Sequence, residues 1–230
     1  MDRRYSPENV VAAVKRQPLG RTTNMHIAHI NYAEVLESAF PDRDSADSYI
    51  TSVERIADDP NIPATIVHQA ARLLCLSDRV EEFAKGRPAL QILFFIMAAE
   101  AVSKLFYKYQ GQDHSKAYVN KFFNEFCTEK HRRLLSRAMK RDDTFMTTED
   151  CVDFLYKIRC DVAHEGRYFH LSLPESTIPE DISLSQLQSV GSYIDDARVD
   201  SYISSGDLRQ IIVEGSVRAS QLFKSSVGAP

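Results

Sequence analysis

The sequence predicts an all-α fold, a helical bundle, on three observations. Apolar residues recur at helical spacing over 63–84, over 88–109 and again over 148–164. Glycines stand where two of these segments are expected to end, at Gly111 and Gly166. Only 8 of the 230 residues are glycine, which leaves little material for the glycine-rich phosphate loops of dinucleotide-binding folds.

The first part of the chain predicts shorter helices. Ser6-Pro7-Glu8 is a helix start, because serine caps a helix and proline suits its first position. Short helices are expected over 30–39 and 43–57, among prolines that interrupt regular structure. We therefore expect residues 1–62 to form an N-terminal helical extension without an assigned role, and residues 63–230 to form the main helical domain.

The segment 88–109 is the most apolar of the chain. A helix that is apolar over more than half of its circumference is normally central to a bundle. Its longest apolar run, over 89–102, is interrupted by Gln91 and Glu100 and is shorter than the ~20 residues that a membrane span needs. The sequence therefore predicts a core helix here and no membrane span.

The helix over 148–164 has clear start and stop signals. Thr147 followed by Asp150 resembles a capping box, and Gly166 is a natural C-terminal stop. The remaining elements are expected to be two helices over 114–127 and 130–141, a turn at 142–144, an irregular or extended segment over 168–173, a surface loop over 174–190 and a last helix over 205–224.

Composition excludes several classes of protein. With 43% hydrophobic residues the chain is not disordered as a whole, and with 28 basic against 32 acidic residues it has no generally basic coat. The N-terminus MDRRYSPENV lacks the apolar stretch of a secretory signal. The four cysteines lack the close pairs of a zinc site and are expected to be reduced thiols, namely Cys75, Cys127, Cys151 and Cys160. We expect a cytoplasmic protein without metal or cofactor.

His164 is the histidine best placed for chemistry. It ends the helix over 148–164, where a side chain can leave the packed face, and Arg159 precedes it by five residues. This spacing alone selects nothing, because Arg21 and His26 have it too. On an ideal helix the two side chains would lie about 140° apart. Either the helix unwinds near Gly166, or two copies of the helix meet and share a cleft.

The segment 154–166, which contains Arg159-Cys160-Asp161-Val162-Ala163-His164, resembles the signature helix of HEPN domains. That family's motif is Arg, four to six residues, then His. Glu100, near the end of the apolar helix, resembles the family's acidic residue on an earlier helix. The resemblance extends over roughly residues 65–225 and is strongest at 88–109 and 150–168.

The resemblance implies a dimeric helical bundle and a metal-independent endoribonuclease. His164 would assist proton transfer while the RNA 2′-hydroxyl attacks the adjacent phosphate. Arg159 would neutralise the developing phosphorane charge, supported by Asp161 and Glu100. The expected product is a 2′,3′-cyclic phosphate, in the context of prokaryotic defence or stress response.

Alternatives stay open at this point. The family often has Asn, Asp or His directly after the arginine, whereas this chain has Cys160, which favours a non-catalytic HEPN-like dimer that binds a partner protein or nucleotide. Locally, His164 could cap its helix, Glu100 could pair with Lys104 four residues later, and Asp161 could be solvated or paired with Arg159. A third alternative is a DNA-binding regulator that uses the 130–141 helix.

The partners expected from the sequence are RNA, a second copy of the chain, and an antitoxin or effector protein. A cationic helix face over 130–141 would supply phosphate contacts, although a solvated face balanced by nearby acids is the ordinary alternative. The basic residues of this segment are Lys130, His131, Arg132, Arg133, Arg137, Lys140 and Arg141. Arg167 and Tyr168, just after the motif, are further candidates for RNA contacts.

Overall fold

The computed structural model describes residues 30–57, 60–84, 87–108, 114–166, 171–176, 190–194 and 197–227. The chain divides into two units, residues 1–30 and residues 31–230, and every element below belongs to the second. The helix start at Ser6-Pro7-Glu8 lies outside the described residues. So does most of the predicted loop over 174–190, while residues 171–176 form neither helix nor strand.

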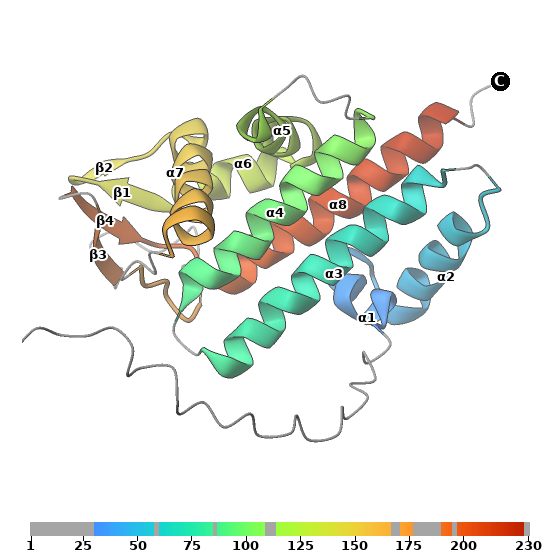
Figure 1. The fold of residues 1–230 in the computed structure, drawn as a ribbon, viewed down its shortest axis with the longest axis horizontal. Coiled ribbons are helices and arrows are strands. Elements are labelled where there is room, and N and C mark those ends of the chain that lie inside the picture. Colours follow the sequence, from blue (N-terminus) through green and yellow to red (C-terminus); the bar gives the residue numbers. More distant parts are fainter. Residues whose placement is uncertain are drawn as a thin grey trace, which may run out of the picture. The chain divides into compact units, whose positions relative to one another are not determined.

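Helices dominate the second unit, as the sequence predicts (Figure 1). In chain order the elements are α1 (Tyr32–Leu36), the 3₁₀ turn η2 (Glu37–Ala39), α2 (Arg43–Glu54), α3 (Ile62–Phe83), α4 (Pro88–Phe106), α5 (Ser115–Lys121), the π turn η3 (Phe122–Phe126), α6 (Glu129–Leu135), β1 (Met139–Arg141), β2 (Thr144–Phe145), α7 (Thr148–Cys160), the π turn η4 (Asp161–Glu165), β3 (Val190–Ile194), β4 (Ala197–Ser201) and α8 (Ser205–Val227).

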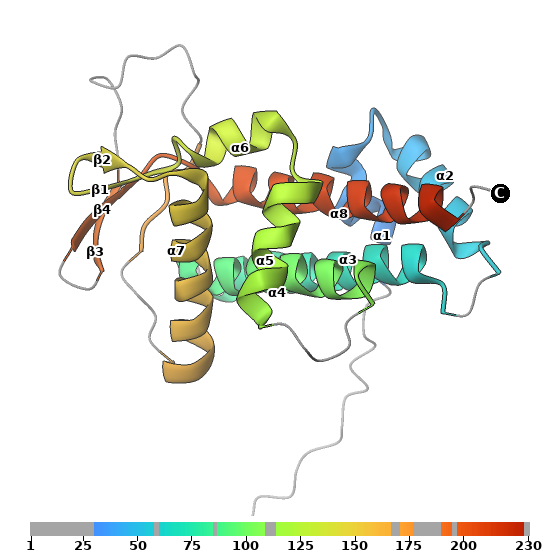
Figure 2. The same ribbon diagram turned by 90° about the horizontal axis from the view of Figure 1, so that it is seen from above.

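Three long helices, α3, α4 and α8, pack side by side and form the centre of the unit (Figures 1 and 2). Helix α4 also contacts α5 and α7, which explains why it is apolar around most of its circumference. In the part of the chain that the structure describes, α4 alone is long and apolar enough to cross a membrane. Its position among four other helices accounts for that composition.

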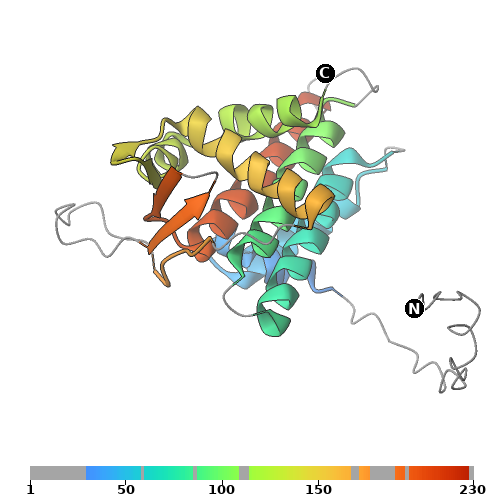
Figure 3. The same cartoon turned by 60° about the vertical axis from the view of Figure 1, so that its left-hand side comes forward.

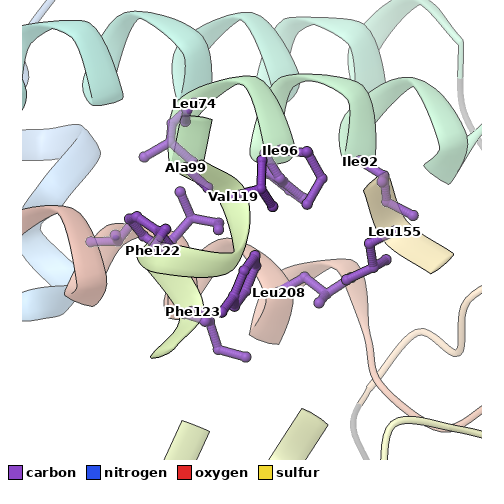
Figure 4. Packing of buried hydrophobic residues seen from close by; sticks show 14 of the residues in the cluster. Leu74, Ile92, Ile96, Ala99, Val119, Phe122, Phe123, Leu155 and Leu208 are labelled. Atoms are coloured by element: carbon purple, nitrogen blue, oxygen red, sulfur yellow. The ribbon is translucent and has the colours of Figure 1, made fainter. Parts of the chain in front are cut away.

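The core joins residues from nearly every helix. Figure 4 shows this packing around Leu74, Ile92, Ile96, Ala99, Val119, Phe122, Phe123, Leu155 and Leu208. Phe122, Phe123 and Phe126 belong to η3, a π turn inside the segment that the sequence predicts as one helix over 114–127. These aromatic residues are apolar in either helical form, so the apolar pattern does not distinguish an α-helix from a π turn.

The N-terminal boundary of the unit differs from the one that the sequence predicts. Helices α1 and α2 belong to the unit that starts at Asn31, rather than to an extension ending at residue 62. Leu36 and Ile50 lie in the same core cluster as the long helices. Tyr49 Oη also donates to Ser220 Oγ of α8 at 2.8 Å. A short amphipathic helix can bury its apolar face only against another element. Here α3 and α8 are the elements against which α1 and α2 pack.

A small antiparallel sheet departs from the predicted all-α fold (Figure 3). Its strand order is β2-β1-β4-β3. The β1–β2 hairpin turns at Asp142 and Asp143, whose φ values of 48° and 65° match a two-residue type I′ turn. The prediction of one helix over 130–141 was wrong, because α6 ends at Leu135 and Met139 pairs with Ser201 of β4.

Candidate functional site

Helix α7 presents the candidate motif, and its predicted start and stop are confirmed. Thr147 Oγ1 accepts the Asp150 N–H at 3.1 Å, and Asp150 Oδ2 accepts the Thr147 N–H at 3.4 Å. At the other end Gly166 has φ 61°, and its N–H bonds to the Asp161 carbonyl. The apolar stripe of α7, including Phe154 and Leu155, is buried. These signals fix where the motif helix begins and where it ends.

Glu100 of α4 joins Arg159 of α7 in an ion pair. Arg159 Nη2 lies 3.1 Å from Glu100 Oε2, and the two side chains are 17% and 10% exposed. The other oxygen of Glu100 accepts from Lys104 Nζ at 2.6 Å. The sequence offered two alternatives for Glu100, a helical pair with Lys104 or a place near the motif arginine. In the structure both occur together.

Glu100 is charged despite its partial burial. Burial by itself raises the pKa of its carboxyl. Hydrogen bonds from Lys104 and Ser115, together with the charges of Arg159 and Lys104, outweigh burial and leave this pKa below its ordinary value. One carboxylate thus sits between two cations, and the group as a whole keeps an excess of one positive charge.

The guanidinium of Arg159 has an N–H group without an acceptor among the described residues. Its Nε is buried and has no hydrogen-bond partner among the described residues. Its Nη1 lies 3.9 Å from Cys160 Sγ, which is a weak acceptor. A buried N–H without an acceptor is unfavourable, but an external ligand can reach only the part of this side chain that is exposed, which is 17%. A phosphate oxygen has the charge and the geometry that a guanidinium fork prefers.

Tyr156 is a member of the site that the sequence did not single out. Its ring centroid lies 5.7 Å from Arg159 Cζ. Burial raises the pKa of Tyr156, and a hydrogen bond with Cys160 adds to the effect. Tyr156 precedes Arg159 by three residues and Cys160 by four, the two spacings that place side chains next to each other on a helix. That spacing was the available signal.

His164 lies at the end of the motif helix and is exposed. It makes no hydrogen bond or ion pair with another residue of the described part. The helix widens into the π turn η4 and ends at the left-handed Gly166. A π turn bonds residues five apart, so it advances less per residue and reduces the angle between Arg159 and His164 from its α-helical value. One chain nevertheless holds Arg159 against α4 and His164 in solvent.

Asp161 has a different partner from either of those considered. Its Oδ2 accepts from Lys157 Nζ at 2.7 Å, and its side chain is 15% exposed. It is therefore neither freely solvated nor paired with Arg159. The i, i+4 spacing from Lys157 explains this pairing, since both side chains lie on one face of α7.

The predicted basic face over 130–141 does not exist as one surface. His131 is buried and bonds to Glu214 at 2.9 Å. Arg132 donates to the carbonyls of Asn124 and Cys127 and pairs with Glu129. Arg133 also lies near Glu129, and Lys140 and Arg141 stand on strand β1 instead of a helix. Lys130 and Arg137 are exposed, while Arg167 and Tyr168 lie outside the described residues.

The cysteines are all free thiols. Cys127 and Cys151 are buried, and burial raises the pKa of each to about 12. Cys75 and Cys160 are partly exposed. The buried pair behaves as small apolar core residues, in line with the sequence-based interpretation.

Comparison with protein-family models, with curated proteins and with solved structures gives no match to this chain. The evidence for function is therefore the geometry around Glu100, Arg159 and His164 and the short motif that contains two of these residues.

Proposed function

We propose that this chain is a metal-independent endoribonuclease of HEPN type that acts as a homodimer in the cytoplasm. The observation that carries the proposal is the ion pair between Glu100 and Arg159. Besides the Arg–His motif, the resemblance includes an acidic residue on an earlier helix, which is Glu100 here. The meeting of Glu100 and Arg159 is consistent with that feature.

In the proposed reaction His164 takes the proton of an RNA 2′-hydroxyl. The 2′-oxygen bonds to the adjacent phosphorus, the bond to the 5′-oxygen breaks, and that oxygen takes up a proton. The products are a 2′,3′-cyclic phosphate and a 5′-hydroxyl. Arg159 balances the charge that grows on the phosphorane, and Glu100 holds the guanidinium in place.

Two copies of the motif helix would complete the site. Arg159 faces α4 within its own chain, whereas His164 is exposed at the end of η4. If the α7 helix of a second copy approaches, each chain contributes residues to a shared cleft. The exposed His164 of one chain would then lie next to the RNA phosphate bound in that cleft. The family context adds a role in prokaryotic defence or stress response, with an antitoxin or effector protein as a further partner.

The test is a ribonuclease assay on total RNA with excess EDTA. His164→Ala is expected to fold normally and lose cleavage, because an exposed side chain at a helix end adds little to the core. His26→Ala is the matched control, since His26 has the same spacing from its own arginine. The parent and the control are expected to leave 2′,3′-cyclic ends.

Cleavage by His164→Ala at the parental rate would refute the assignment. If the folded parent leaves RNA intact, the alternative function becomes the working one: a non-catalytic helical dimer that binds a protein or nucleotide.

A further inference from the structure

The three nitrogens of the Arg159 guanidinium differ in what they contact. Nη2 pairs with the Glu100 carboxylate at 3.1 Å. Nε is buried and has no hydrogen-bond partner in the part of the chain that the structure describes. Nη1 lies 3.9 Å from Sγ of Cys160, and a thiol is a weak acceptor. A substrate oxygen therefore replaces the present contact most easily at Nη1, where it has to displace a thiol instead of a carboxylate.

The pair with Glu100 does not by itself fix the direction of Nη1. Among the contacts of the described residues, this pair is made through one nitrogen and one carboxylate oxygen. A bidentate pair, in which two nitrogens bond to the two oxygens of a carboxylate, would set the plane of the guanidinium as well. A guanidinium held at one nitrogen can rotate about that contact, so its plane needs a second support.

The ring of Tyr156 is in the right place to give that support. Its centroid lies 5.7 Å from Arg159 Cζ, within the distance of about 6 Å over which a ring face attracts a cation. A guanidinium is planar and stacks on aromatic faces, which an ammonium group does not do. The ring and the Glu100 carboxylate together therefore restrain the guanidinium in both position and plane.

The ring of Tyr156 is itself held in place. Tyr156 is partly buried and packs against the hydrophobic core. A hydrogen bond joins it to Cys160, and burial together with this bond raises the pKa of its hydroxyl. Tyr156 is thus neutral near neutral pH, and it faces Arg159 as a ring and not as a phenolate. Tyr156, Arg159 and Cys160 stand at positions i, i+3 and i+4 of α7, so the helix sets their spacing.

We propose that Tyr156 is a positioning residue that, together with Glu100, holds the Arg159 guanidinium with Nη1 directed at the scissile phosphate. This inference rests on the proposed ribonuclease function and adds a residue that acts through Arg159 without touching the RNA. Glu100 holds one end of the guanidinium, the ring of Tyr156 sets its plane, and a phosphate oxygen replaces the Cys160 thiol at Nη1. A charged group that is already oriented stabilises the transition state without reorganisation during the reaction.

Steady-state cleavage of one defined RNA tests this role. Tyr156→Leu removes the ring and is expected to lower kcat about 10-fold while KM stays within about 2-fold, because a misdirected guanidinium loses interactions made in the transition state. Tyr156→Phe keeps the ring and is expected to keep kcat within about 2-fold of the parent. Tyr156→Met takes the place of Tyr156→Leu if the leucine variant does not fold, since methionine adapts to irregular packing.

The matched control is Tyr202→Leu, which removes a tyrosine ring beside a different cation. The Tyr202 centroid lies 5.6 Å from Lys140 Nζ, a distance close to that between Tyr156 and Arg159. This variant is expected to cleave at the parental rate. An equal fall of kcat in Tyr202→Leu would show that the loss of any such ring disturbs the fold, and would overturn the assignment of Tyr156.

A second measurement follows the guanidinium itself and does not require cleavage. The buried Nε–H of Arg159 is expected to give an NMR signal in protein labelled with nitrogen-15, and Arg159→Lys identifies this signal by its absence. Tyr156→Leu is expected to shift and broaden the signal, because the guanidinium regains rotation. Tyr156→Phe and Tyr202→Leu are expected to leave it unchanged.

Three results would overturn the proposal while the ribonuclease function stands: parental kcat in Tyr156→Leu, the same loss of kcat in Tyr156→Phe, or a rise of KM alone. The last would assign Tyr156 to direct RNA binding, such as stacking on a base. If the folded parent does not cleave RNA, the ribonuclease proposal fails and the NMR signal decides alone. An unchanged signal in Tyr156→Leu then refutes the positioning role, and a broadened one retains Tyr156 as the residue that orients Arg159.

Discussion

Glu100 and Arg159 are 59 residues apart in the sequence, and their side chains meet at 3.1 Å between α4 and α7. The same carboxylate also binds Lys104, so three charged residues from two helices form one group. Its members are mostly withdrawn from solvent. Removing Glu100 therefore leaves two cations without a counter-charge in a place where water can do little to replace it.

Glu100→Gln is expected to lower the free energy of unfolding by about 2 kcal/mol, because Arg159 and Lys104 then lack a carboxylate. Urea unfolding measures the loss. A double-mutant cycle with Arg159→Gln should show a coupling energy of about 1 kcal/mol. Strict additivity would mean that the ion pair contributes nothing to stability.

Arg159→Ala is expected to slow RNA cleavage by about 10²–10³-fold, the usual effect of losing one charge-stabilising group. The fragments should keep the same ends, because His164 still directs the proton transfer. Mapping of fragments from one defined RNA gives both the rate and the cleavage positions. Arg137→Ala, which removes another exposed arginine, serves as the control. Parental rates in Arg159→Ala would exclude a catalytic role for this guanidinium.

Thr147→Ala is expected to lower stability by about 1 kcal/mol, since it removes the N-cap of the motif helix. The Asp150 N–H then loses its acceptor at 3.1 Å. Thermal or urea unfolding checks this value. Thr144→Ala, at an exposed position of β2, should change stability by no more than about 0.5 kcal/mol. Equal effects from the two variants would show that the cap is dispensable.

Gly215→Ala is expected to destabilise the protein by about 1–3 kcal/mol through overpacking. A Cβ at this position would lie 2.6 Å from Cζ of Phe122, a ring that is fully buried. Gly206→Ala near the start of the same helix meets only Ser204 Oγ at 3.6 Å, so this variant should be neutral or gain up to about 1 kcal/mol. A stabilised Gly215→Ala would show that Phe122 can move aside.

Stability is expected to decrease on acidification because of His131. Burial lowers the pKa of His131 below its ordinary value of 6.5, and the charges of Lys130 and Arg218 act in the same direction, against Glu214. Between the two pKa values the unfolded chain binds more protons, so the free energy of unfolding falls as pH drops below about 6.5.

In addition to burial, His131 Nδ1 accepts the Thr128 N–H at 3.3 Å and cannot do so once protonated. Urea unfolding at pH 7.5 and at pH 5.5 measures the change, and His131→Gln should make it smaller. An identical pH dependence in that variant would assign the effect to other groups.

The long helices could be predicted because periodicity and end signals agree along them, whereas the segment 130–141 was wrongly predicted as one helix. For α7 the Thr147–Asp150 box and Gly166 define both ends, and the structure uses both signals. The proximity of Glu100 to Arg159 could be anticipated only through the motif resemblance. Periodicity indicates which face of a helix is buried, but it does not indicate which helix lies against that face.

The sheet and the π turns could not be predicted for physical reasons. Strands β1 and β2 contain three and two residues, too few to show alternation. Their stability depends on pairing with β4, which is far away in sequence. The segments 122–126 and 161–165 fit an α-helix and a π turn equally well by composition. Their form is decided by packing and, for η4, by the left-handed Gly166 that follows.

The π turn η4 also gives the motif a tolerance to insertion and deletion. A π turn accommodates a residue more than an α-helical turn within one helix, without shifting the chain on either side. Deleting Ala163 would convert this stretch to regular α-helix and place the histidine four residues after Arg159, directly above it on the same face. The distance between the two motif side chains can therefore be tuned in steps of one residue, while the capped and buried part of α7 keeps its register against α4.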